Sequence, residues 1–397
     1  MDGAGSIDVD RPLEGIEVGH RAALGVAPRH RLGERLRVAG RHVRSQGGLR
    51  HDLSFGAAAW TERPARLLRL LAECLVHAVQ CTAVATLLPL SPMVLTMHGH
   101  DDIRIGTLVP AHDRTPEIVA ALLPHGFESF QVSFGKSLAG RDLPDLARRL
   151  TEVLAAHTPA PGEPAPQISA LGVYGNPLVS PETIADWETL IDRAADFGCR
   201  IVAGFAGRLP GRPVPESIPR FGEVFRPLAR RAADRGVKLA FENCDKRGDW
   251  NSGDFNIAHA PRAWEAMFNE VPSDVLGLEW EPCHQLVSFV DPLPQLRQWA
   301  HKIWHIHGKD ATVLWDVVRE HGIRGGVPYV HHRTPGFGDT DWTQLISELR
   351  LAGWRGSIDI EGFHDPVYRD RLETTGQVAA LDYLKRCRGG PYIPNIF

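Results

Sequence analysis

Residues 275–284 read VLGLEWEPCH, a short apolar run that ends in a glutamate and is followed by a proline. Such a run is typical of a buried β-strand whose acidic residue lies at its carboxyl end. The pattern recurs at 237–243 (VKLAFEN), 302–307 (KIWHIH) and 357–361 (SIDIE). The carboxyl-terminal half is therefore predicted to contain four strands that end in carboxylates or imidazoles.

Four more strands are predicted upstream, at Ile103–Val109, Ser129–Ser133, Ile168–Tyr174 and Arg200–Phe205. Helical patterns separate the strands, for example at Leu143–Ala155, Pro181–Asp196, Val224–Asp234 and Trp342–Ala352. Alternating strands and helices are typical of a parallel sheet with crossover connections. Eight such units predict an α/β fold, namely a (β/α)8 TIM barrel. An open doubly wound sheet is the alternative, but the chain has no G-x-G-x-x-G after the first strand and no Walker A loop.

The composition excludes several classes of protein. The 397 residues are 43% hydrophobic, which excludes wholesale disorder, and the net charge of −4 argues against broad binding to nucleic-acid phosphates. Six cysteines without a C-x-x-C pair exclude a disulfide scaffold and a zinc ribbon. A chain without a disulfide scaffold is typical of a reducing compartment, so we expect a cytoplasmic protein.

Residues 1–96 differ from the rest, with 12 arginines, nine acidic residues, no lysine and no sustained strand or helix period. We expect a poorly ordered or weakly helical extension before a barrel domain at 97–397. A misassigned start site is the alternative, because Met97 lies six residues before the first predicted strand. The stretch Cys74–Leu95 carries no Asp, Glu, Lys or Arg, as a membrane span would. Its prolines and polar residues disfavour such a span, so no membrane partner is expected.

The carboxyl ends of barrel strands meet at one mouth, and side chains alternate between the two faces of a strand. The last acidic or histidine residue of each of the four carboxyl-terminal strands would then lie at this mouth. These residues are Glu242, Glu281, His307 and Glu361. Three carboxylates and an imidazole are costly to bury together without a cation. Oxygen-rich ligands predict one divalent metal, Mn²⁺ first, with Mg²⁺, Co²⁺ or Zn²⁺ as alternatives. The inner residues Glu279, His305 and Asp359 could orient these ligands.

Each residue also has an ordinary structural interpretation. A glutamate at a strand end is usually a salt bridge or a helix cap, His284 could cap the next helix, and His305 is more typical of a hydrogen-bonded core histidine. Four such residues on consecutive strands are much harder to explain in this way.

The order of these motifs resembles the xylose isomerase-like TIM-barrel superfamily, the sugar phosphate isomerase/epimerase family. The matching segments are Glu242, Glu281-Pro-Cys-His284, His305-Ile-His307-Gly-Lys309-Asp310, Pro335-Gly-Phe-Gly-Asp339-Thr-Asp-Trp342 and Ile360-Glu361. The resemblance covers the barrel domain and is most specific over 237–362. It implies an enzyme of carbohydrate metabolism in which Glu242, Glu281, His307 and Glu361 bind the metal.

The resemblance further implies that Glu242 and Glu361 exchange protons with substrate carbon, and that His284 contacts a substrate oxygen. The expected activity is isomerisation or epimerisation of a small sugar or polyol through a metal-stabilised enediolate. A lyase or dehydratase acting on an inosose or a 3-oxo-glycoside is the alternative. An endonuclease IV-like phosphodiesterase and a non-catalytic binding barrel are weaker alternatives.

The sequence departs from the family pattern in several places. The strand-six acid is usually Asp rather than Glu281, and the Glu and Arg of ketose 3-epimerases are replaced by Gly248 and Val313. These changes argue against a strict free-ketose 3-epimerase. His332 matches an endonuclease IV ligand, but the companion ligands are replaced by Val330, Gln131 and Asn176.

Other residues near the mouth are candidates for substrate binding. Asn176 could donate to a sugar hydroxyl or only form a turn. Lys309 could bind substrate or pair with Asp310. The segment Ala311–Asp341 is the longest connection and could act as a lid, in which His332 and Arg333 place positive charge over the substrate or form an exposed basic turn. A homo-oligomer is compatible with the sequence.

Overall fold

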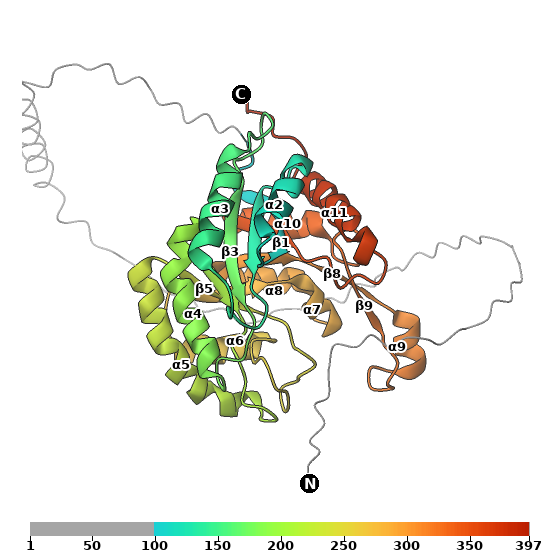
Figure 1. The fold of residues 1–397 in the computed structure, drawn as a ribbon. Helices are drawn as coiled ribbons and strands as arrows, with labels where there is room; N and C mark the ends of the chain where they lie inside the picture. Colours follow the sequence, from blue (N-terminus) through green and yellow to red (C-terminus); the bar gives the residue numbers. More distant parts are fainter. Residues whose placement is uncertain (1–98, 397) are drawn as a thin grey trace, which may run out of the picture. The chain divides into compact units, whose positions relative to one another are not determined.

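Eight parallel strands close into a barrel in the order β1-β10-β7-β6-β5-β4-β3-β2 (Figure 1). The computed structural model describes residues 99–396. The expectations for residues 1–96, including the stretch Cys74–Leu95, lie outside these residues. Within 99–396, no helix combines the length and the apolar character that a membrane crossing requires. The predicted (β/α)8 barrel is confirmed.

All eight predicted strands are present, with ends that differ from the predicted ones by two residues or fewer. The barrel strands are β1 Ile103–Pro110, β2 Ser129–Ser133, β3 Gln167–Val173, β4 Ile201–Gly204, β5 Lys238–Glu242, β6 Leu276–Trp280, β7 Ile303–Gly308 and β10 Gly356–Ile360. Glu242 pairs in register with Glu279, which in turn pairs with His305. This register brings the polar ends of the late strands to neighbouring positions.

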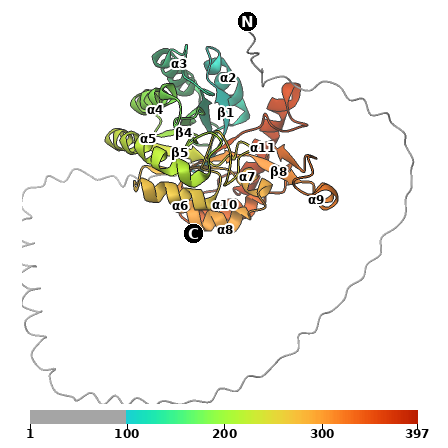
Figure 2. The same cartoon turned by 90° about the horizontal axis from the view of Figure 1, so that it is seen from below.

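The helices form a ring outside the barrel (Figure 2). They are α2 Thr115–Leu122, α3 Leu143–Ala156, α4 Pro181–Arg193, α5 Val214–Arg235, α6 Pro261–Glu270, α7 Pro282–Val287, α8 Pro292–Trp299, α10 Trp342–Leu351 and α11 Glu373–Cys387. Several begin at a side chain that accepts a backbone N–H, as Asp142 does for α3 and Ser180 for α4, each followed by a proline in the first turn. Large apolar residues such as Trp187 and Trp264 are fully buried in the core.

The helix predicted at Val224–Asp234 starts too late in the sequence. The observed helix, α5, begins ten residues earlier, at Val214. Pro219 and Pro227 lie inside this helix, although proline removes a helical hydrogen bond. The helix continues across both prolines, and its apolar face, including Phe221 and Phe225, is buried in the core. Packing of that face therefore overrides the local preference for a break.

The connection at Ala311–Asp341 is not an irregular loop. It contains β8 Asp310–Val313 and β9 Val330–Arg333, which pair as an antiparallel hairpin, and helix α9 Trp315–His321 between them. Figure 1 shows this arm, in orange, projecting from the barrel. The hairpin places His332 and Arg333 in strand β9.

A buried ion pair ties the last helix segment to the first strands. Arg388 makes a bidentate contact with Glu128, at 2.5 and 2.8 Å, and both side chains are almost fully buried. Glu128 also accepts a hydrogen bond from the backbone N–H of Ile105. These contacts fasten the end of α11 to the starts of β1 and β2.

Replacing Glu128 by alanine is expected to lower the free energy of unfolding by about 3–5 kcal/mol, because it leaves the Arg388 charge buried without a partner. Urea unfolding followed by circular dichroism measures the change. Glu152→Ala is the matched control, since Glu152 pairs with Arg148 on the exposed surface of α3 and should leave the midpoint unchanged. Equal midpoints for the parent and Glu128→Ala would contradict this role for the ion pair.

Candidate metal centre

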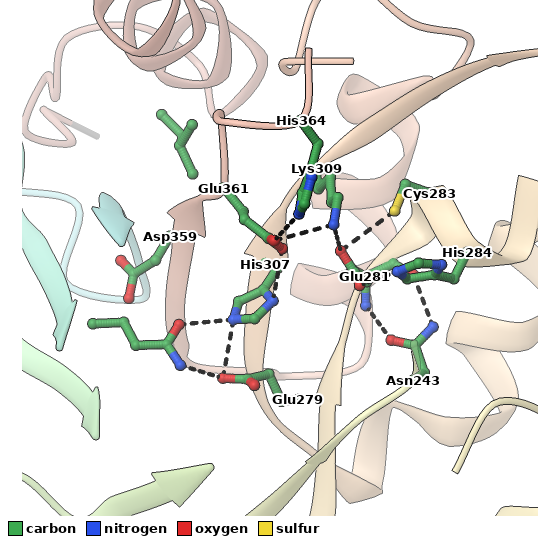
Figure 3. A network of polar contacts seen from close by, with 12 residues as sticks. Asn243, Glu279, Glu281, Cys283, His284, His307, Lys309, Asp359, Glu361 and His364 are labelled. Carbon is green, nitrogen blue, oxygen red and sulfur yellow. Dashed lines mark hydrogen bonds and ion pairs between the residues drawn. The ribbon is translucent and has the colours of Figure 1, made fainter. Parts of the chain in front are cut away.

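Four side chains meet at the carboxyl end of the barrel. Glu242 ends β5, Glu281 follows β6, His307 lies in β7 and Glu361 follows β10. One ligand atom from each lies within 4.8 Å of those from the other three, and all four residues are buried. Figure 3 shows Glu281, His307 and Glu361 facing one another. The structure thus brings together the four side chains predicted to share a cation.

Three ligand atoms of this cluster lack a hydrogen bond within the described residues. His307 Nδ1, Glu281 Oε1 and Glu361 Oε2 are buried, and none makes a hydrogen bond within the described residues. His307 Nδ1 lies 3.3 Å from Glu361 Oε2. Unsatisfied buried donors and acceptors are costly, whereas a divalent cation would satisfy all three at once. Three carboxylates and one imidazole therefore fit a Mn²⁺-class ion.

The ring of His307 is held with Nδ1 toward the cluster. Its other nitrogen, Nε2, lies 2.7 Å from Gln131 Oε1 and 3.1 Å from Glu279 Oε1. An acceptor at Nε2 fixes the proton on that nitrogen and leaves the Nδ1 lone pair free for a metal. Gln131 comes from β2, across the barrel from β7, so the interior itself orients this ligand.

A polar network fills the barrel below the cluster. His305 bridges Glu279, 3.0 Å from its Nδ1, and Asp359, 2.7 Å from its Nε2. Asp359 also accepts hydrogen bonds from Ser129 and Ser169. The bond from Ser169 on β3 crosses the barrel to β10. These residues are almost completely buried, so the network sets the positions of the side chains above it.

The pKa values of two glutamates in the site, Glu242 and Glu361, are shifted in opposite directions. Burial raises the pKa of Glu242 well above its usual value, and the carboxylates of Glu281 and Glu361 raise it further. Burial also opposes ionisation of Glu361, but Lys309, 3.1 Å away, and the rings of His307 and His364, each 3.3 Å away, hold its pKa well below the usual value. Without an ion, the site therefore favours the protonated form of Glu242 and the ionised form of Glu361.

The Glu242→Gln variant is expected to be more stable than the parent at neutral and alkaline pH when no metal is bound. A carboxyl with a raised native pKa keeps a proton that the unfolded chain loses near pH 4.5. The free energy of unfolding therefore falls as pH rises from there through the native pKa, and glutamine removes this fall. Thermal unfolding in EDTA at a series of pH values measures the difference. Identical pH profiles for parent and variant would show that Glu242 titrates normally.

The substrate-binding candidates divide into two groups. Near the cluster, His284 Nε2 lies 2.8 Å from Glu281 Oε1, and the His332 ring lies 5.5 Å from that of His284. Lys309 pairs with Glu361 and, at 3.8 Å, with Glu281, and not with Asp310. Burial lowers the pKa of His332 to about 4, so this ring is neutral at pH 7 rather than a source of positive charge.

The structure does not bring Asn176 and Arg333 to the cluster as free groups. Asn176 donates to the carbonyls of Arg208 and Asp254 and accepts from the N–H of Leu178. Its amide is therefore occupied in holding loops together. Arg333 donates from Nε to Asp365, which is buried, so its charge is paired.

Sequence reasoning missed several residues around the cluster. Gln131 and Tyr174 both bond Glu279, from β2 and from the end of β3, and His364 lies 3.3 Å from Glu361. A polar residue inside a buried strand, as Gln131 is, could have indicated a partner inside the barrel. Which partner it meets depends on contacts across the barrel, and strand alternation does not give these.

Comparisons with known proteins agree with the fold. A family model described as "Xylose isomerase-like TIM barrel" matches residues 119–387. The rhizopine catabolism protein MocC of Rhizobium meliloti is 27% identical over 157 residues, a stretch that covers 38% of this chain and only 44% of that protein.

Solved structures share the fold at lower identity. The 3-keto-D-glucoside 4-epimerase YcjR from E. coli has a TM-score of 0.53 and 16% identity, covering 72% of this chain and 100% of that one. The probable 3-DHS dehydratase AsbF from Bacillus anthracis has a TM-score of 0.51 and 15% identity, covering 70% and 98%. At such identities, these likenesses bear on the fold alone.

Proposed function

The chain belongs to the xylose isomerase-like TIM barrel family, and from this premise we propose that it is a metal-dependent isomerase or epimerase of a small sugar or polyol. The observation that carries the proposal is the buried convergence of Glu242, Glu281, His307 and Glu361. Within the described residues, one ligand atom from each of the last three has no hydrogen-bond partner. The proposed ion is Mn²⁺, with Mg²⁺, Co²⁺ and Zn²⁺ as alternatives.

When bound, the ion would supply Lewis-acid polarisation of a substrate carbonyl. The proton transfers are assigned to Glu242 and Glu361. Two carboxyl groups whose environments push their pKa values apart are suited to act as acid and base. Glu361, which Lys309 keeps ionised, removes a proton from the carbon beside the carbonyl, and Glu242 returns one. Return to the opposite face gives an epimer, and return to the neighbouring carbon gives an isomer.

Three side chains beside the cluster are proposed to position the substrate. His284 and Lys309 are buried next to Glu281, and His332 reaches toward His284 from the hairpin. A neutral His332 can donate to or accept from a hydroxyl without adding charge to the site. This arrangement suits a polyhydroxylated substrate, whose oxygens need several fixed partners.

Elimination from an oxo-sugar is the second candidate reaction. Gly248 and Val313 favour it, because ketose 3-epimerases carry a glutamate and an arginine at these positions. A side chain at position 248 would meet Arg208, since a Cβ there would lie 3.1 Å from Arg208 Nη1. Arg208 is fully buried and donates to the carbonyls of Arg212 and Asp249, so the glutamate that ketose 3-epimerases carry would require Arg208 to shift. Proton removal by the same pair of glutamates followed by loss of a β-leaving group would give a lyase.

We also propose a cellular location and a binding partner for the protein. All four cysteines within residues 99–396 are free thiols, which suits a reducing cytoplasm. The partner we propose is a small-molecule sugar or polyol and not a nucleic acid.

A substrate screen in deuterated water tests the function. The full chain with Mn²⁺ is incubated with free ketoses, inososes and 3-oxo-glycosides, and products are followed by NMR and mass spectrometry. We expect one substrate class to gain deuterium at the carbon beside its carbonyl. Unchanged composition apart from deuterium indicates isomerisation or epimerisation, and a lost leaving group indicates elimination. A protein that binds Mn²⁺ but exchanges no proton in any class would contradict the proposal.

A further inference from the structure

A second group of potential ligands lies directly beside the four-residue cluster. It consists of Glu242, Cys244 and His284, and one ligand atom from each lies within 4.8 Å of those of the other two. Cys244 follows β5 two residues after Glu242, and His284 lies in the first turn of α7, three residues after Glu281. The 4.8 Å limit is close to the span of two metal–ligand bonds of about 2.0–2.3 Å each.

The His284 ring in this second group of ligands has no hydrogen-bond partner within the described residues. Its side chain is only 6% exposed, and neither ring nitrogen makes a hydrogen bond within residues 99–396. Nε2 lies 2.8 Å from Glu281 Oε1, but the two atoms are not aligned for a hydrogen bond. Figure 3 shows the ring beside Glu281 and Cys283. A buried imidazole with two unsatisfied nitrogens is costly, and a bound cation would remove part of that cost.

We propose that Cys244, His284 and Glu242 form a second cation site, specific for a thiophilic divalent ion such as Zn²⁺. Thiolate and imidazole are the ligands that zinc prefers, whereas the neighbouring cluster offers mainly oxygen. Glu242 belongs to both ligand groups, so its carboxylate would be shared between the two ions. Three protein ligands leave one position open, as in zinc sites that bind water or substrate.

The other nearby thiol is the less suitable ligand. Cys283 is fully buried and donates from Sγ to Glu281 Oε2 at 3.3 Å, so it already has a partner. Cys244 is partly exposed, so its side chain is accessible to an ion from solvent. Cys283 therefore serves as the matched control, because it carries the same chemical group beside the same histidine.

The site is tested by cobalt and zinc binding to the full chain. Cys74 and Cys81, outside the described residues, are first replaced by serine so that they contribute no thiolate. With Mn²⁺ saturating the oxygen-rich cluster, added Co²⁺ is expected to produce a thiolate-to-cobalt charge-transfer band, and Zn²⁺ is expected to bind at one extra ion per chain. Cys244→Ser should lose both the band and the extra ion, and Cys283→Ser should keep them.

Alkylation of unmutated Cys244 by iodoacetamide, followed by mass spectrometry, provides a measurement that does not depend on the folding of a variant. Zn²⁺ is expected to slow this alkylation, and Mg²⁺ is expected to leave it unchanged. The proposal is overturned if the cobalt band survives Cys244→Ser, if no band forms, or if Zn²⁺ does not protect Cys244. Each of these readouts is independent of turnover, so a failure here leaves the proposed reaction at the first centre untouched.

Discussion

Replacing Glu361 by glutamine is expected to slow proton exchange into the substrate by about 10²–10⁴-fold, the usual contribution of a general base. Glu361 is the ionised carboxylate of the pair, held in that state by Lys309 and by the nearby rings of His307 and His364. Glutamine keeps the shape and one oxygen but cannot accept the proton. Glu242→Gln should have an effect of similar size, because it removes the group that returns the proton.

The measurement is the rate of deuterium incorporation into the substrate class that the screen identifies, with circular dichroism to verify the fold. Both glutamates also face the proposed ion, so rates are compared at saturating Mn²⁺. Glu320→Gln, on the exposed end of α9, is the control and should keep the parent rate. If both site variants exchange protons as fast as the control, the assignment of acid and base is wrong.

Replacing His307 by alanine is expected to weaken Mn²⁺ binding more than any substitution outside the cluster. It removes the one nitrogen ligand, whose Nδ1 faces the carboxylates without another hydrogen bond. Glu279→Gln should have a smaller effect, about 10–100-fold, because Glu279 holds the opposite nitrogen of the same ring and does not face the ion directly.

Calorimetric titration of the metal-free protein with Mn²⁺ measures both effects. His331→Ala is the control, because His331 lies on the exposed side of β9 and should bind Mn²⁺ as the parent does. Unchanged affinity in His307→Ala would place the ion elsewhere. An effect of Glu279→Gln as large as that of His307→Ala would show that Glu279 is itself a ligand.

The barrel and the meeting of the four side chains could be predicted because both follow from local rules. Each strand is a short apolar run between turn and helix signals. Strand alternation then places residues such as Glu242 and His307 on a defined face at a defined end. Closure of the barrel brings those ends to one mouth, so little more than strand order was needed.

Contacts that cross the barrel or depend on loop paths could not be predicted in the same way. The bond from Gln131 to His307 joins strands that are not neighbours. The amide of Asn176 is used by backbone groups of two distant loops, which no local pattern shows. The nearness of Cys244 to His284 depends on how the chain leaves β5 and enters α7.

Anomalous diffraction from crystals soaked in Mn²⁺ tests most directly whether the four side chains hold one ion. The structure predicts a single strong manganese peak, roughly 2.0–2.3 Å from His307 Nδ1 and from oxygens of Glu242, Glu281 and Glu361. An ordered site without a manganese peak among these atoms, or a peak held by other residues, would contradict the account.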